Sequence, residues 1–151
     1  MLCPTNILVP TDFSKYSDKA LKQALDIAQE YKAKVYLIHV VPAEFRTIKD
    51  DYTDFSLTEE TVRQYEEKLI ASARKRIEKQ AARLLCGRTI EIILETVMGK
   101  PEKEIIRFQH EKGIDLVVIS SLGKSGLSQY LMGSVAREVL KKTTCPVLLT
   151  K

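Results

Sequence analysis

The stretch from Leu116 to Val135, LVVISSLGKSGLSQYLMGSV, decides how the rest of this chain is interpreted. An unbroken apolar run, Leu116–Ile119, ends at two serines, and a helical pattern resumes at Ser134 after three glycines at 123, 126 and 133. A buried strand that leads through a small-residue loop to a helix start presents bare backbone N–H groups to an anion. Glycine lets such a backbone curl and approach a ligand closely. The spacing leaves two interpretations open: a loop that holds the phosphates of a nucleotide, or a plain strand-to-helix connection with glycine turns.

The composition is typical of one globular domain. The 151 residues are 44% hydrophobic and 29% charged, and we expect a single domain over residues 1–151. The 24 basic and 20 acidic residues interleave, which favours a solvated surface over a nucleic-acid-binding face. No apolar run reaches the length of a membrane span, and the N-terminus MLCPTNILVP lacks the charged start of a signal peptide. Three scattered cysteines fit neither a disulfide framework nor a zinc site, so we expect a cytoplasmic protein with reduced thiols.

Apolar runs alternate with helical patterns along the chain. The runs predict five strands, at residues 6–10, 34–41, 88–97, 115–120 and 146–150. The periodic segments predict a helix capped by Ser17, a third helix from Pro101 to before Gly113, and a fourth over residues 134–142. Strands that alternate with helices favour an α/β fold with one open parallel sheet and right-handed crossovers.

The second predicted helix is the longest. A capping box of Ser56 and Glu59 opens it, and its pattern continues to about Leu84. We expect one apolar face to lie on the sheet, carried by Val62, Tyr65, Leu69, Ala73 and Ile77. The polar residues 42–56 before it show no periodicity, which predicts a loop or lid.

Asp12 follows directly after the first predicted strand, as the glycine loop follows the fourth. Ligands of open parallel sheets bind beyond the carboxyl ends of the strands, where the strand order reverses. If strands one and four are neighbours, Asp12 and the glycine loop face the same crevice. The alternative for Asp12 is a loop-capping carboxylate before a helix.

Five blocks of the sequence resemble the universal stress protein family. They are ILVPTDFS, HVVP, VMGKP, GKSGLSQYLMGSVAREVL and CPVLL, in the family's order and over nearly the whole chain. The resemblance implies a five-stranded parallel sheet of order 3-2-1-4-5 with helices on both faces. That architecture is Rossmann-like, of the adenine nucleotide alpha hydrolase-like type. The resemblance also implies a homodimer formed through the C-terminal strand.

One branch of that family binds ATP through a motif of Gly, two residues, Gly, nine residues, Gly, then Ser or Thr. Gly123, Gly133 and Ser134 match its second part, whereas Ser120 stands at its first glycine. The resemblance implies bound ATP, or AMP or ADP, with Asp12 on the ribose or on Mg²⁺ through water. The implied nucleotide-binding residues are Pro10, Thr11, Asp12, Val40, Met98, Gly99, Ser120, Gly123, Lys124, Ser125, Gly126, Gly133, Ser134 and Val135.

Individual residues have alternative interpretations. Val40 offers backbone groups to adenine by analogy, with Met98 and Gly99 along the base. Ser134 can cap its helix as well as bind phosphate. His39 is expected to be a half-buried structural residue rather than a catalyst. Serine at 120 is either strained by roughly 1–2 kcal/mol where positive φ is needed, or tolerated through its hydroxyl where only space is needed.

Three functions compete at this point. The first is a regulatory stress protein in which the ATP state changes the dimer surface or a partner surface. The second is a slow Mg²⁺-dependent ATPase that uses Asp12, for which the sequence offers no arginine finger or evident water-positioning base. The third is a dimeric stress protein that acts without nucleotide.

Overall fold

The computed structural model describes residues 3–43, 58–123 and 132–151. Apart from Pro42 and Ala43, the expected lid at 42–56 lies outside the described residues, as do Lys124, Ser125 and Gly126. Within the described ranges, no helix combines the length and the apolar character needed to cross a membrane.

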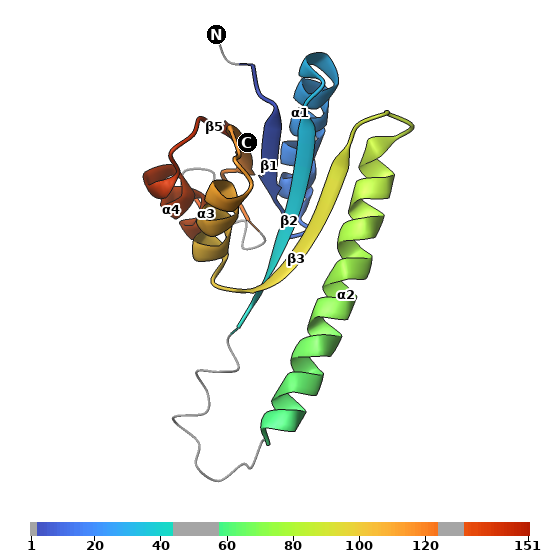
Figure 1. Cartoon of the computed structure of the whole chain (residues 1–151), viewed down its shortest axis with the longest axis vertical. Coiled ribbons are helices and arrows are strands. Elements are labelled where there is room, and N and C mark those ends of the chain that lie inside the picture. Colours follow the sequence, from blue (N-terminus) through green and yellow to red (C-terminus); the bar gives the residue numbers. More distant parts are fainter. Residues whose placement is uncertain (1–2, 44–57, 124–131) are drawn as a thin grey trace.

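One sheet of five parallel strands forms the centre of the molecule, in the order β3-β2-β1-β4-β5 (Figure 1). The strands are β1 (Asn6–Pro10), β2 (Lys34–Pro42), β3 (Ile92–Gly99), β4 (Leu116–Ser120) and β5 (Val147–Thr150). The expected fold class and strand order are therefore confirmed. The central strands β1 and β4 are the most buried because helices cover both faces of the sheet.

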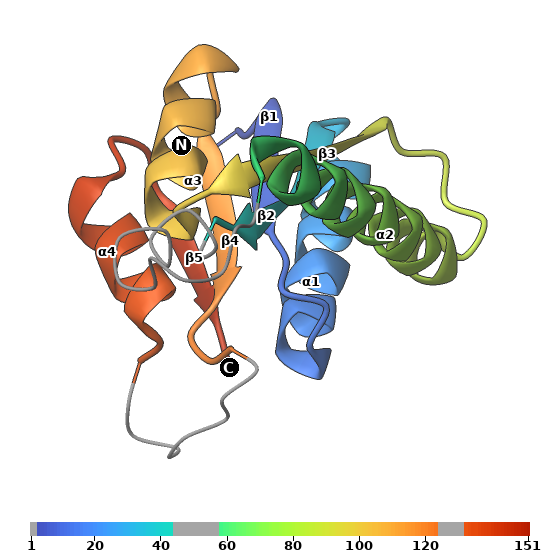
Figure 2. The same cartoon turned by 90° about the horizontal axis from the view of Figure 1, so that it is seen from below.

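The described residues form four helices, which make up the two outer layers (Figure 2). They are α1 (Lys15–Tyr31), α2 (Glu59–Leu85), α3 (Pro101–Glu111) and α4 (Ser134–Lys142). Side chains of β1 alternate between the two resulting cores, as a pleated strand requires. Ile7 and Val9 pack in the core that contains α1 and α2, and Leu8 packs in the core that contains α3 and α4.

Helix α1 begins earlier than predicted. Its N-cap is Ser14, whose hydroxyl accepts the Ser17 N–H at 3.2 Å. The expectation that Ser17 caps the helix is wrong, because Ser17 lies inside the first turn and is only 3% exposed. Two serines three residues apart offered two possible starts, and the loop after β1 is short enough to use the first.

Helix α2 begins at Glu59, with Thr58 as its N-cap. The Thr58 hydroxyl accepts the Thr61 N–H at 3.2 Å, so the expected Ser56 cap is wrong, and Ser56 itself lies outside the described residues. The C-terminal half packs on the sheet through Ile77 and its neighbours.

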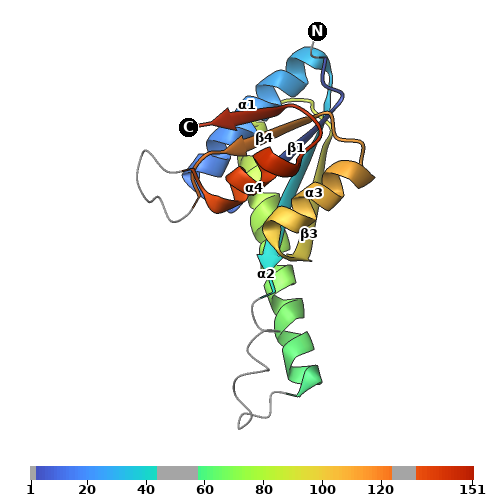
Figure 3. The ribbon, with the colours of Figure 1, turned by 90° about the vertical axis from the view of Figure 1, so that its left-hand side faces the viewer.

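The N-terminal half of α2 extends past the sheet (Figure 3). There the predicted apolar face is not buried: Tyr65 is 45% exposed. The apolar stripe continues along the helix further than the sheet does.

Strand β3 is shifted from its predicted position, to residues 92–99 instead of 88–97. Its partner β2 begins at Lys34, and Val35 pairs with Ile92. Residues before Glu91 therefore have no ladder partner on β2. At the other end the pairing continues to Pro42 and Gly99, beyond the end of β1.

Candidate functional site

The candidate site lies at the carboxyl ends of β1 and β4. These two strands are neighbours in the sheet, with Ile7 opposite Leu116 and Leu8 opposite Val117. From β1 the chain proceeds to β2 on one side, while β4 pairs on the other side, so the strand order reverses here. This is the place where open parallel sheets bind ligands.

Asp12 and Gly123 face each other across this strand boundary. One Asp12 carboxylate oxygen, Oδ1, accepts the Ser14 N–H at 2.9 Å. The other, Oδ2, lies 3.1 Å from the position that a Cβ on Gly123 would occupy. Gly123 does not have positive φ. Glycine at this position therefore accommodates the close approach of the carboxylate rather than an unusual backbone conformation, and a Cβ would oblige the Asp12 side chain to shift by a few tenths of an ångström.

Gly133 brings the far end of the glycine loop back to the same place. Its N–H donates to the Ser121 carbonyl oxygen at 2.7 Å, and a Cβ on Gly133 would lie 3.9 Å from the Gly123 nitrogen. Gly133 is also the N-cap of α4, so the expectation that Ser134 fills that position is wrong. Ser134 is the first helical residue and is exposed.

The N-terminus of α4 has no side-chain cap and no acidic residue in its first turn. The first N–H groups of a helix have no intrahelical partner, and they carry the positive end of the helix dipole. In chemical terms, this end of α4 suits an anion that reaches it from the Asp12 and Gly123 side.

Ser120, at the position where the motif has glycine, is 8% exposed and does not have positive φ. Its hydroxyl donates to the Leu122 carbonyl oxygen at 2.7 Å and is 3.2 Å from the Leu122 N–H, from which it accepts. The strain expected for serine in a positive-φ conformation is therefore absent. The hydroxyl closes the turn that leads out of β4.

The ends of β1 and β2 place Pro10, Thr11 and Val40. Pro10 is half-buried and is the last residue of β1. The Thr11 N–H donates to the Ile38 carbonyl oxygen at 2.8 Å, so the backbone groups of Ile38 point toward β1. Val40 lies two residues further along β2, so its backbone N–H and C=O groups point to the same side as those of Ile38, beyond the last residue of β1. The Val40 side chain is 7% exposed and packs among the α3 and α4 side chains.

Met98 and Gly99 lie in a different hollow, between α2 and the carboxyl ends of β2 and β3. Its volume is about 630 Å³. The lining residues are Ala43, Arg63, Glu66, Glu67, Ile70, Ala71, Arg74, Met98 and Gly99. This hollow shares none of these residues with the group formed by Asp12, Gly123 and Gly133. Val135, from the start of α4, packs in the core that contains α3 and α4.

The described residues contain no group of three or more His, Cys, Asp or Glu side chains arranged to hold a metal. Asp12 supplies one carboxylate. Mg²⁺ in nucleotide sites is commonly held by one or two carboxylates together with phosphate oxygens and waters. Asp12 therefore fits a metal that arrives with a nucleotide, and not a metal held by protein groups alone.

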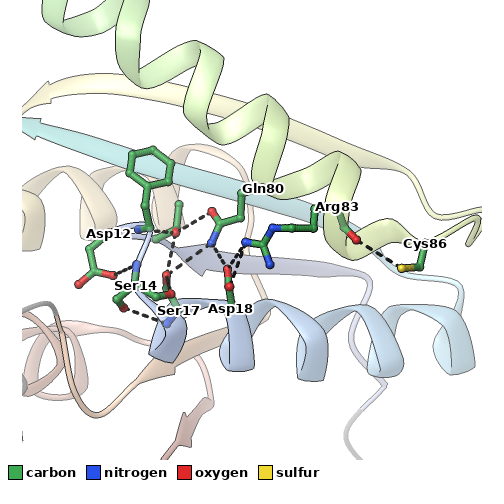
Figure 4. A network of polar contacts seen from close by, with 9 residues as sticks. Asp12, Ser14, Ser17, Asp18, Gln80, Arg83 and Cys86 are labelled. Atoms are coloured by element: carbon green, nitrogen blue, oxygen red, sulfur yellow. Dashed lines mark hydrogen bonds and ion pairs between the residues drawn. The ribbon is translucent and has the colours of Figure 1, made fainter.

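Sequence reasoning missed a buried polar network behind Asp12 (Figure 4). Its centre is Gln80 of α2, which is 4% exposed and accepts a hydrogen bond from the Thr11 hydroxyl at 2.8 Å. The signal was present, since Gln80 falls on the apolar stripe between Ile77 and Leu84. His39 is half-buried as expected, with its Nδ1 2.7 Å from the Thr11 carbonyl oxygen.

Three comparisons relate this geometry to known proteins. The model of the universal stress protein family matches residues 4–151. Universal stress protein MJ0531 of Methanocaldococcus jannaschii is 34% identical over 145 residues, which cover 96% of this chain and 81% of that protein. The solved structure of MJ0577, from the same organism, is similar with a TM-score of 0.83 at 31% identity, over 99% of this chain and 97% of that one. A universal stress protein from Archaeoglobus fulgidus, solved in complex with dAMP, has a TM-score of 0.68 at 21% identity, over 99% of this chain and 100% of that one.

Proposed function

This chain belongs to the universal stress protein family, and from that membership we propose that it is a regulatory protein that binds an adenine nucleotide. The proposed ligand is ATP, or ADP or AMP, at the carboxyl ends of β1 and β4. The observation that carries the proposal is the close approach of the Asp12 carboxylate to Gly123, beside a start of α4 that has no side-chain cap. The dAMP complex of a protein with the same fold supports the choice of an adenine mononucleotide.

Each group in the proposed site has a chemical role. The first N–H groups of α4 and the glycine-loop backbone hold the phosphates. Asp12 accepts a ribose hydroxyl or holds Mg²⁺ through water. The backbone of Val40, turned past the end of β1, bonds the adenine edge. Lys124, Ser125 and Gly126 belong to this site by the family resemblance, whereas Met98 and Gly99 reach it only if the base extends toward α2.

Binding is best tested by titration calorimetry of the purified chain with ATP, AMP and GTP, with and without Mg²⁺. We expect both adenine nucleotides to bind, and GTP to bind at least tenfold more weakly because the adenine edge is read by backbone groups. Phosphate release from ATP that Asp12→Ala abolishes would favour the slow ATPase. If no adenine nucleotide binds at millimolar concentration, the proposal is wrong and a stress protein that acts without nucleotide remains.

The proposed regulatory output is a homodimer formed through β5. Val147–Thr150 are all partly exposed, and within the described residues β5 pairs only with β4. The Pro146 carbonyl accepts the Val117 N–H of β4, and the Thr150 carbonyl accepts the N–H of Ser121, directly after β4. Alternation therefore turns the backbone N–H and C=O groups of Val147 and Leu149 to the outer side of the sheet. An apolar edge of this kind suits a second copy of the same strand across a two-fold axis.

Sedimentation at micromolar concentration tests the dimer. We expect a dimer for the wild type and a monomer for Leu149→Pro, which removes an outward N–H while the bonds to β4 remain. A monomeric wild type would overturn this part of the proposal. We also propose a cytoplasmic location, since Cys3, Cys86 and Cys145 are all free thiols.

A further inference from the structure

The loop of residues 11–14, here called the Asp12 loop, contains an unusual backbone conformation. Phe13 has a φ of 65°, in the left-handed region. For a residue with a side chain this conformation is strained, because Cβ comes too close to the backbone. Such residues persist where the surrounding structure holds them, and they concentrate at functional sites.

Two side chains from outside the loop hold the Phe13 ring. The His39 ring, from β2, has its centroid 4.3 Å from that of Phe13. The Arg76 guanidinium, from α2, lies 4.2 Å from the Phe13 centroid, in a cation–π contact. Helix α2 therefore contacts the loop on its aromatic residue.

Gln80, one turn further along α2, contacts the same loop through Thr11. The Gln80 amide N–H group donates to Asp18 Oδ1 at 2.8 Å. An ionised carboxylate only accepts hydrogen bonds, so the carbonyl end of Gln80 has to face Thr11. The Thr11 hydroxyl has two acceptors within reach, Gln80 Oε1 at 2.8 Å and the Ser17 hydroxyl oxygen at 3.0 Å, and the bond to Gln80 is the shorter. Arg83 fixes Asp18 in turn, with its Nη2 2.9 Å and 3.0 Å from the two carboxylate oxygens.

With its hydrogen directed to Gln80 in the shorter of these bonds, the Thr11 oxygen accepts the Phe13 N–H at 3.1 Å. The next N–H, that of Ser14, donates to Asp12 Oδ1. These bonds fix the turn that directs Asp12 Oδ2 toward Gly123. Thr11 is 6% exposed and Gln80 is 4% exposed, so water does not replace the bond between them.

We infer that Gln80 and Arg76 of α2 are positioning residues that set adenine-nucleotide affinity by holding the Asp12 loop from behind. This inference rests on the proposed function and assigns to α2 a part in the site. Gln80 acts through Thr11, and Arg76 acts through Phe13. Neither side chain belongs to the group of Asp12, Gly123 and Gly133 that faces the nucleotide.

The experiment is a double-mutant cycle on ATP affinity with Gln80→Met and Thr11→Val. Gln80→Met keeps the length of the side chain and removes both ends of the amide. We expect each single variant to raise the Kd about tenfold, the equivalent of one lost hydrogen bond. Because Gln80 acts through Thr11, the double variant should raise it no further. Additive losses would overturn the assignment.

Arg83→Met is the matched control, because Arg83 belongs to the same network but bonds Asp18 rather than the Asp12 loop. It should lower the melting temperature and change the Kd less than twofold. Arg76 provides a second route should Gln80→Met fail to fold, since its side chain is exposed. Arg76→Met should weaken ATP binding severalfold, and Arg76→Lys should retain most of the affinity.

Amide hydrogen exchange without nucleotide provides a separate readout. Exchange at the Phe13 and Ser14 amides should accelerate in Gln80→Met and stay unchanged in Arg83→Met. Wild-type affinity and wild-type exchange in Gln80→Met would overturn the inference and leave the proposed function intact. If the wild type itself binds no adenine nucleotide, both fail together.

Discussion

Helices α1 and α4 both begin on the side of the sheet where β1 and β4 end, but their first turns are built differently. In α1 the Ser14 hydroxyl accepts the Ser17 N–H, and Asp18 places a negative charge in the first turn. In α4 the N-cap is Gly133, with no side-chain cap and no acidic residue in the first turn. The Ser17 N–H of α1 thus has a side-chain partner, whereas among the described residues no side chain caps the start of α4.

This difference separates two tasks within one crevice. Helix α1 is capped by Ser14, so Asp12 is not needed as its cap, and the Asp12 side chain is directed toward Gly123. Helix α4 lacks a capping side chain, which in general contributes about 1 kcal/mol to stability. Its N-terminus, where the helix dipole is positive, is left without a negative side chain in the first turn. In the proposed complex the phosphates belong to α4, and the ribose or a Mg²⁺ ion belongs to the carboxylate before α1.

Gly133→Asp would give α4 the kind of first turn that α1 has. The N-cap φ of −58° is open to any residue, so the carboxylate should cap the helix and raise unfolding stability by a few tenths to about 1 kcal/mol. The same carboxylate repels phosphate and occupies its N–H groups. We expect ATP affinity to fall about 100-fold or more, by a charge repulsion of a few kcal/mol at short range.

Calorimetry and thermal unfolding of the same sample measure both effects. Gly133→Asn is the matched control, because it caps the helix without adding charge and should weaken binding less. Binding at wild-type strength in Gly133→Asp would show that α4 does not receive the phosphates.

Ser120→Gly tests the strand that leads toward α4. The change removes a hydroxyl that bonds Leu122 and relieves no positive φ. We therefore expect ATP affinity to change by tenfold or less, about 1.4 kcal/mol. Ser120→Ala removes the hydroxyl and keeps the Cβ, so a comparison with Ser120→Gly separates the effects of the two groups on ATP affinity. A wild type that fails to bind ATP while Ser120→Gly binds tightly would show that serine blocks the site.

Ser14→Ala tests the cap of α1. Loss of the bond to the Ser17 N–H should lower unfolding stability by about 1 kcal/mol. For a chain of this size that is roughly 2–4 °C in melting temperature. Nucleotide affinity should change less than twofold, and Ser14→Thr should restore the stability. A large loss of affinity at unchanged stability would place Ser14 in the nucleotide site instead.

The smallest expected effect concerns the other end of α4. A hydrogen bond and the positive charge of Lys142, with a further contribution from Lys141, lower the pKa of Glu138. A lowered pKa in the folded state stabilises the protein above the unfolded-state pKa, and that contribution disappears as the pH falls through the folded-state value. Glu138→Gln should therefore lower the melting temperature slightly at pH 7, and the difference from wild type should disappear as the pH falls through the lowered pKa of Glu138. A difference that persists in acid, or one that 1 M salt does not reduce, would contradict the ion-pair origin.

Periodicity and turn residues predicted the layout of the fold because each signal is local. The β-branched run of Lys34–Pro42 and the proline at the start of α3 specify their elements within a few residues. The start of β3 was not predictable in this way, since it depends on where β2 begins. Burial on the apolar face of α2 was predicted correctly at Ala73 and Ile77 and wrongly at Tyr65. The sequence of the helix does not indicate where the sheet beneath it ends.

The candidate site divides in the same manner. Gly123 and Gly133 were predicted from motif spacing and Asp12 from its place after the first strand and the family resemblance, and the structure brings these three residues together. That Met98 lies against α2 depends on the length of β3 past the end of β1. Gln80 was missed because a glutamine on an apolar stripe reveals its partner only when Thr11 and Asp18 are placed beside it.

The pairing of β1 with β4 has a consequence for how the chain folds. Asp115 accepts bonds from the Thr5 and Asn6 N–H groups across 109 to 110 residues of sequence, whereas β1 and β2 are adjacent along the chain. Contacts of such long sequence separation form late, because loop closure has to be achieved before they contribute. We therefore expect β1, β2 and β3 to assemble first and β4 with β5 to dock last. Asp12 and Gly123 lie on opposite sides of the junction between β1 and β4. A bound nucleotide would therefore link the two parts of the sheet that join last, and molecules with nucleotide bound would unfold more slowly than those without it.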